Sequence, residues 1–73
     1  MFTNIKMTID ENLGFVGVSC YKDGLPHGIP NDLNNMDYQD ILDEIIANGT
    51  KNFAKDETIP TELQKNIDDK KSS

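Results

Sequence analysis

An apolar stripe in the middle of the chain constrains the fold more than any other feature. Five apolar residues recur at intervals of three and four, the spacing that places side chains on one face of a helix: Tyr38, Ile41, Leu42, Ile45 and Ile46. Asn34 and Asn35 precede the stripe and can cap a helix, and Gly49 follows it and can end one. We therefore expect a helix over Met36–Asn48 that needs a second apolar surface to pack against.

The first third of the chain is predicted to supply that surface as a β-hairpin. Apolar and polar residues alternate over residues 1–9, which is the period of a strand with one apolar face. Residues 10–14 contain turn formers, and residues 15–21 are rich in β-branched and aromatic side chains. Residues 25–32 hold two prolines and a glycine, so we expect them to form a loop.

Three aromatic residues of this hairpin have no cover within the predicted fold. Strict alternation places Phe15 and Tyr21 on the face opposite Val18 and Cys20, and Phe2 lies near them. One interpretation is that Phe2, Phe15 and Tyr21 are scattered surface aromatics, which are common. The other is that they form an interface, where this face or a free strand edge docks onto a partner that adds strands.

The chain after the central helix is predicted to contribute less to the core. Phe53 can fold back against the apolar stripe, and residues 61–67 can form one or two helical turns. A docked helix and a disordered tail are both open for this segment, and a short helix followed by disorder is favoured. The prediction is thus a small α+β domain over residues 1–55, a hairpin packed on one amphipathic helix, with a tail over residues 56–73.

The residue types that carry chemistry are too few, or too poorly spaced, to predict a catalytic or metal site. Cys20 and His27 are the only cysteine and histidine, which excludes an internal disulfide and leaves too few soft ligands for structural zinc. Asp37, Asp40 and Asp43 recur every three residues and drift around the helix surface. Cys20 with His27 is the one conceivable nucleophile and base, and we interpret Cys20 as an apolar strand residue. We predict a non-enzyme without catalytic residues, metal or cofactor.

Charge and hydropathy limit the classes of partner. The formal net charge is −6, and residues 31–73 hold five lysines against ten acidic residues. This balance predicts no direct binding to nucleic acid, because phosphate backbones bind clustered basic side chains. No apolar run reaches the ~20 residues that span a bilayer, so no membrane partner is expected. At 73 residues the chain buries a modest core, and a partner protein is the remaining support.

The segment from Asp23 to Thr50 resembles a module of small proteins and tail-fibre-associated proteins of tailed bacteriophages. In that module an Asp-Gly turn precedes an Ile-Pro-x-Asp segment, a later Asn, and an Asp-Tyr-Gln that opens a short helix. The matching residues here are Asp23-Gly24, Ile29-Pro30-Asn31-Asp32, Asn35, Asp37-Tyr38-Gln39, Leu42 and Gly49-Thr50. The chain departs from the pattern where Pro26-His27-Gly28 extends the segment before Ile29, and where Glu44 stands near the place of a frequent tryptophan.

The resemblance implies a phage protein that is made in the host cytoplasm and located in the virion. The function it favours is a structural or interaction protein, a tail- or fibre-associated adaptor that packs on other virion proteins in several copies. A capsid decoration protein is one alternative. Another is a non-virion accessory protein, either an assembly chaperone or an inhibitor of a host protein.

Overall fold

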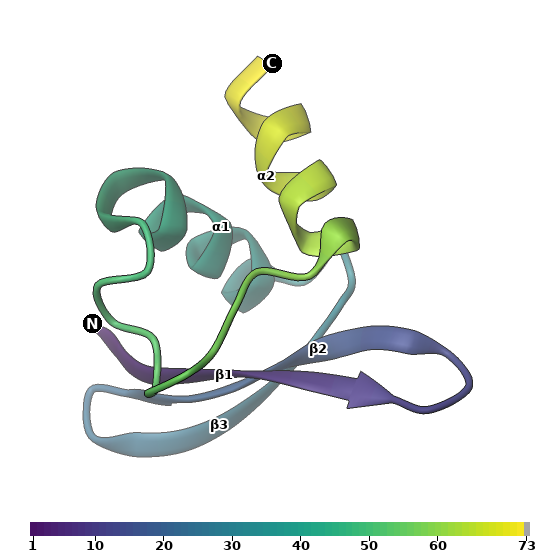
Figure 1. Ribbon diagram of the computed structural model, residues 1–73. Helices are drawn as coiled ribbons and strands as arrows, with labels where there is room; N and C mark the ends of the chain where they lie inside the picture. Colours follow the sequence, from purple (N-terminus) through teal and green to yellow (C-terminus); the bar gives the residue numbers. More distant parts are fainter. Residues whose placement is uncertain (73) are drawn as a thin grey trace.

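The computed structural model describes residues 1–72 and shows an α+β fold in two layers (Figure 1). One layer is an antiparallel sheet with strand order β1-β2-β3, and two helices lie on one side of it. The element bounds are β1 Phe2–Asp10, β2 Gly14–Lys22, β3 Leu25–Pro30, α1 Met36–Asn48 and α2 Thr61–Ser72. The predicted α+β class is confirmed.

Helix α1 has the bounds that the sequence predicts, because both of its ends are specified locally. The Asn35 side-chain oxygen accepts a hydrogen bond from the Tyr38 backbone N–H at 3.0 Å, which caps the first turn. At the other end Gly49 has a φ of +63°, and its N–H donates to the Ile45 carbonyl oxygen at 2.7 Å.

The stripe of α1 faces the core, except at its edge. Tyr38, Ile41, Leu42 and Ile45 are buried, as predicted. Ile46 is 37% exposed, so its prediction as a core residue is wrong. It lies about 100° around the helix from Ile45, at the flank of the stripe and outside the covered face.

Residues 25–30 form the third strand, which corrects the prediction of a loop. Asn31 donates its N–H to the Val16 carbonyl oxygen at 2.9 Å, and the register continues through the Cys20–His27 pair. Hydrogen-bonded and non-hydrogen-bonded pairs alternate in an antiparallel ladder, so the backbone groups of Pro26 and Pro30 point away from β2. The prolines therefore remove no ladder hydrogen bond, and the strand tolerates them.

A bulge at Asn4 turns Phe2 into the core. Between Thr3 and Lys6, β1 contains one residue more than the facing part of β2, and Asn4 there has a left-handed φ of +52°. The extra residue reverses the alternation of faces, so Phe2 lies on the same side as Ile5 and is buried. The prediction that Phe2 lies on an uncovered face is therefore wrong.

A second bulge has the same effect on Phe15. Between Phe15 and Gly17, β2 contains one residue more than β1, which is Val16. Phe15 consequently shares the inner face with Val18 and is buried, contrary to the prediction. Of the three aromatics assigned to an interface, Tyr21 alone is exposed.

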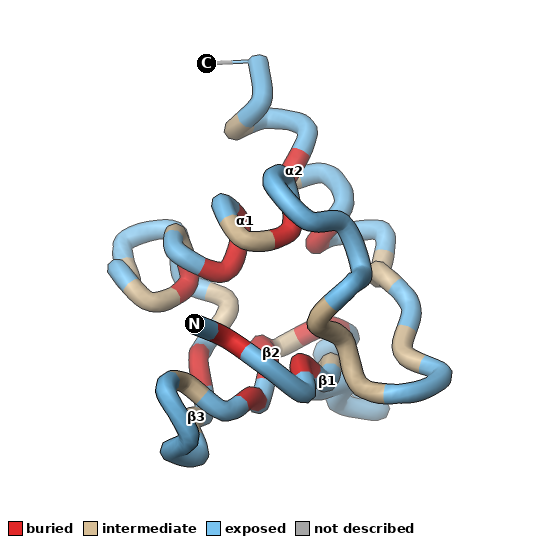
Figure 2. Tube along the Cα trace, turned by 90° about the vertical axis from the view of Figure 1, so that its left-hand side faces the viewer, coloured by how far each residue is buried: buried red, intermediate tan, exposed pale blue. Residues whose placement is uncertain are grey.

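The segment after residue 55 belongs to the same core as the rest of the chain (Figure 2). Helix α2 begins where predicted but continues to Ser72, so the prediction of disorder after residue 67 is wrong as far as the described residues extend. Leu63 and Ile67 are fully buried, and the predicted division between residues 1–55 and 56–73 has no counterpart in the packing. The buried residues are Phe2, Ile5, Phe15, Val18, Cys20, Ile29, Tyr38, Ile41, Leu42, Ile45, Leu63 and Ile67.

Truncating Leu63 to alanine should test whether α2 is part of the folded unit. We expect Leu63→Ala to lower the free energy of unfolding by about 2–4 kcal/mol, because it leaves a cavity in the core. Urea denaturation followed by circular dichroism measures this. The matched control is Leu13→Ala at a site that is 76% exposed, where a change under ~0.5 kcal/mol is expected. Equal stabilities for the two variants would mean that α2 does not pack as described.

Gly17 is required by the close approach of β3. A Cβ at this position would lie 2.3 Å from the Ile29 carbonyl oxygen, and φ is +154°. Gly17→Ala should therefore destabilise the fold by at least about 2 kcal/mol, a fall of roughly 8 °C or more in Tm for a chain of this size. Gly28→Ala is the control, since nothing lies within 4 Å of its added Cβ. A thermal melt of Gly17→Ala that matches this control would contradict the register between β2 and β3.

Candidate functional site

Both helices lie on one side of the sheet, so the opposite face is covered by no helix of residues 1–72 (Figure 1). We call it the outer face, and its side chains alternate with the buried ones along each strand. All of its residues except Gly17 are exposed, and Asp10 at the hairpin end of β1 is its one acidic residue although the chain has 13 Asp and Glu. The outer face consists of Thr3, Lys6, Thr8, Asp10, Gly14, Gly17, Ser19, Tyr21, Pro26, Gly28 and Pro30.

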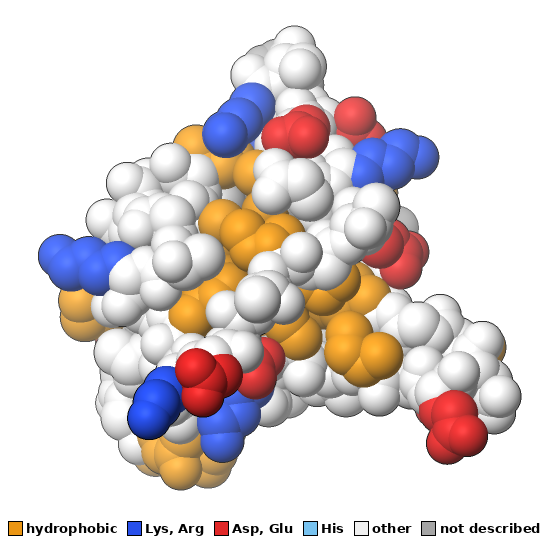
Figure 3. All heavy atoms as spheres, viewed as in Figure 1, with side chains coloured by type: hydrophobic (Ala, Val, Ile, Leu, Met, Phe, Trp, Pro, Cys, Tyr) orange, Lys and Arg blue, Asp and Glu red, His pale blue; other side chains and the backbone are white. Residues whose placement is uncertain are grey.

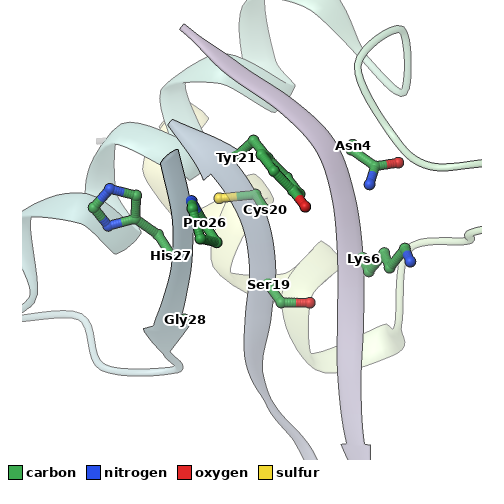
Figure 4. Close-up of a pocket in the computed structure, with 8 residues that line it drawn as sticks. All are labelled: Asn4, Lys6, Ser19, Cys20, Tyr21, Pro26, His27 and Gly28. Atoms are coloured by element: carbon green, nitrogen blue, oxygen red, sulfur yellow. The ribbon is translucent and has the colours of Figure 1, made fainter. Parts of the chain in front are cut away.

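A shallow depression of ≈ 270 Å³ lies on the outer face (Figure 4). Tyr21 and Pro26 are cross-strand partners at one end of it, and the small residues Ser19 and Gly28 are partners further along the same two strands. Tyr21 is 45% exposed, and its ring leans from β2 toward β1, where Asn4 lies. The depression thus combines one large exposed aromatic side chain with a floor that small residues leave open.

Both edges of the sheet offer few free backbone groups to an added strand. Beside β1, the Ile5 N–H donates to the Asn52 carbonyl oxygen at 3.1 Å, and the Ala54 N–H donates to the Ile5 carbonyl oxygen at 2.9 Å. The Met7 N–H donates to a carboxylate oxygen of Glu57 at 2.6 Å. On the outer edge of β3, two of the three outward positions are prolines, which have no N–H to offer. A partner that adds a strand would find Gly28 as the one outward N–H donor of β3.

Cys20 and His27 are brought together as cross-strand partners, but they do not form a catalytic couple. Cys20 is 4% exposed and belongs to the core, and burial raises the pKa of its thiol. A buried neutral thiol is a poor nucleophile, because the thiolate is the reactive form. Within residues 1–72 no hydrogen bond joins the two side chains, and the His27 ring projects away from the other side chains of the depression (Figure 4).

Two of the four acidic residues of α1 pair with lysines of other elements. Lys22 of β2 pairs with Asp37 at 2.9 Å, which raises the pKa of Lys22 and joins the sheet to α1. Lys70 of α2 pairs with Asp43 at 2.8 Å and joins the two helices. Across the described part of the chain, no three His, Cys, Asp or Glu side chains are grouped so that they could hold a metal ion.

A second apolar area lies where the β1–β2 hairpin extends beyond the helices (Figure 3). Ile9 is 58% exposed there and lines a cleft of ≈ 330 Å³ together with Met7 and Pro60. Asp56 and Glu57 also line this cleft, so a partner that enters it meets negative charge. Among the described helices, none has the length and apolar character needed to cross a membrane.

No protein-family model matches the chain, and comparisons with curated proteins and with solved structures found no match.

Two determinants of this surface were missed in the sequence. The depression depends on Ser19 and Gly28 facing each other across two strands, and residues 25–30 were expected to be a loop. Strict alternation also placed Phe15 beside Tyr21, because a bulge cannot be recognised from Val16 alone. A signal for β3 was present in the Asp23-Gly24 turn, which is typical of a hairpin.

The thiol of Cys20 should be unreactive in the folded chain. Its raised pKa keeps it protonated to higher pH than an ordinary cysteine, and its burial blocks access. We expect alkylation by iodoacetamide at about pH 8 to be at least ~10-fold slower in buffer than in urea. Mass spectrometry of the modified chain over time measures both rates. Equal rates would place Cys20 outside the core and reopen its pairing with His27.

Proposed function

We propose that the chain is a structural protein of a bacteriophage virion, a tail- or fibre-associated adaptor that packs on other virion proteins in several copies. The observation that carries the proposal is the uncovered outer face, with Tyr21 exposed beside a depression and no carboxylate around it. Exposed aromatic side chains are enriched where proteins bind each other. The phage assignment itself rests on the resemblance of residues 23–50 to the phage module.

The two edges of the sheet favour a partner that packs on the surface of the domain over a partner that adds a strand to the sheet. Pro26 and Pro30 on one edge, and Asn52 and Ala54 against the other, leave little backbone for a partner strand. The outer face and the cleft beside Ile9 are two surfaces that such a partner could pack on. Either contact would add burial that a core of this size lacks.

The observed charges bear on the alternatives. An accessory protein that imitates nucleic acid would present the carboxylates of α1, yet two of the four, Asp37 and Asp43, are each paired with a lysine. This arrangement favours the virion adaptor over that accessory protein. A capsid decoration protein would use the same outer face and differs from the adaptor in its number of copies.

The test is mass spectrometry of purified particles of the phage that encodes this chain, with copy number per particle. The proposal expects stoichiometric presence, and a tail or fibre location expects a few to tens of copies. Hundreds of copies would indicate capsid decoration. If washed particles lack the chain while the infected cell contains it, the virion proposal is wrong and the accessory class takes its place.

A further inference from the structure

We propose that two copies of this chain pack through their outer faces about a twofold axis, with Tyr21 of each copy seated in the depression of the other. The proposal concerns the chain itself and does not depend on the virion assignment. It names a second copy as the occupant of the surface described above.

The distribution of charge selects this face for self-association. With a net charge of −6, two copies repel each other wherever their carboxylates approach. Two other apolar surfaces carry such groups, since Asp56 and Glu57 line the cleft beside the hairpin and Asp69 lines the groove between the helices. Asp10, at the hairpin end of β1, is the one carboxylate of the outer face, and no carboxylate lines the depression, where Lys6 lies. Two copies therefore meet the least repulsion there.

The shape of the outer face is complementary to itself. A twofold contact requires that a knob and its matching hollow lie on the same surface. Tyr21 is the large exposed side chain of this face, and the depression floored by Ser19 and Gly28 lies directly beside it. At ≈ 270 Å³ the depression is below the roughly 300–1,000 Å³ of pockets that enclose small-molecule ligands. Its size suits a single aromatic ring.

The area of the outer face sets the strength of the contact. Three strands ~4.8 Å apart, with about seven paired residues at ~3.3 Å each, give a surface of roughly 300 Å². Stable interfaces bury about 800 Å² per partner, so this one is weak in free solution. We expect a dissociation constant on the order of 0.1–1 mM, which tethering of copies on a larger assembly would strengthen.

The experiment is a dilution series of the whole chain, labelled with ¹⁵N, from about 2 mM to 20 µM, concentrations that bracket the expected dissociation constant. Amide chemical shifts should change with concentration at the outer-face positions of β1, β2 and β3. Sedimentation equilibrium over the same range should give a mass that rises above 8.2 kDa. A constant mass of one chain up to the highest concentration would overturn the proposal, and so would shifts confined to the hairpin tip near Leu13.

Matched variants distinguish association through the outer face from general effects of added charge or lost apolar area. Thr3 is the cross-strand partner of Tyr21, and Thr3→Glu should weaken association at least ~10-fold by placing a carboxylate in the contact. Thr58→Glu adds the same charge on the linker before α2 and should leave association unchanged. Tyr21→Ala should weaken it, whereas Leu13→Ala should not. Equal behaviour within either pair would overturn the proposal.

Thermal melts of all four variants test whether each remains folded. If a variant does not fold, the dilution series of the unmodified chain still tests the proposal. The two proposals fail separately. A chain that is present in particles but stays monomeric in solution overturns the dimer alone, and a dimer absent from particles overturns the virion role alone.

Discussion

One buried hydroxyl group, that of Tyr38, constrains how the two helices pack on each other. Tyr38 is fully buried at the centre of the core, where its ring packs among the apolar residues of both layers. Its hydroxyl oxygen accepts a hydrogen bond from the Asn66 amide at 2.8 Å, and Asn66 also donates to Asn31 at 3.4 Å. A buried hydroxyl without a hydrogen-bond partner would lower the free energy of unfolding, which is small for a domain of this size. This bond links α2 to α1 and, through Asn31, to the loop after β3, beside the burial of Leu63 and Ile67 and the pairing of Lys70 with Asp43.

Helix α1 was predictable because its determinants lie close together in the sequence, whereas the length of α2 depends on residues far away in the sequence. The bounds of α1 are encoded by Asn35, Gly49 and the stripe between them, all within one short segment. Helix α2 has only Leu63 and Ile67 as apolar anchors, a spacing that alone does not decide between a helix and a disordered tail. Its length follows from contacts with distant residues, among them the bonds from Lys70 to Asp43 and to Gln39.

The candidate surface was predictable only in part, for the same reason. Tyr21 is exposed as its position in a two-faced strand implies, but the faces of Phe2 and Phe15 are set by bulges. Asn4 adopts a left-handed φ, which asparagine tolerates better than most residues. An asparagine in a strand does not by itself predict a bulge. The prolines of β3 indicate a loop when the sequence is considered alone. Only the pairing with β2 shows that neither proline occupies a position that donates a hydrogen bond to β2.

The burial of Leu63 and Ile67 beneath α1 also governs when the chain can fold during its synthesis. The hairpin, β3 and α1 are complete by residue 48, but the inner surface they share stays open until α2 arrives. The nascent chain therefore leaves the ribosome exit tunnel with its apolar side chains still accessible to chaperones and to neighbouring chains. The core of residues 1–72 is therefore complete only once α2 has packed against α1.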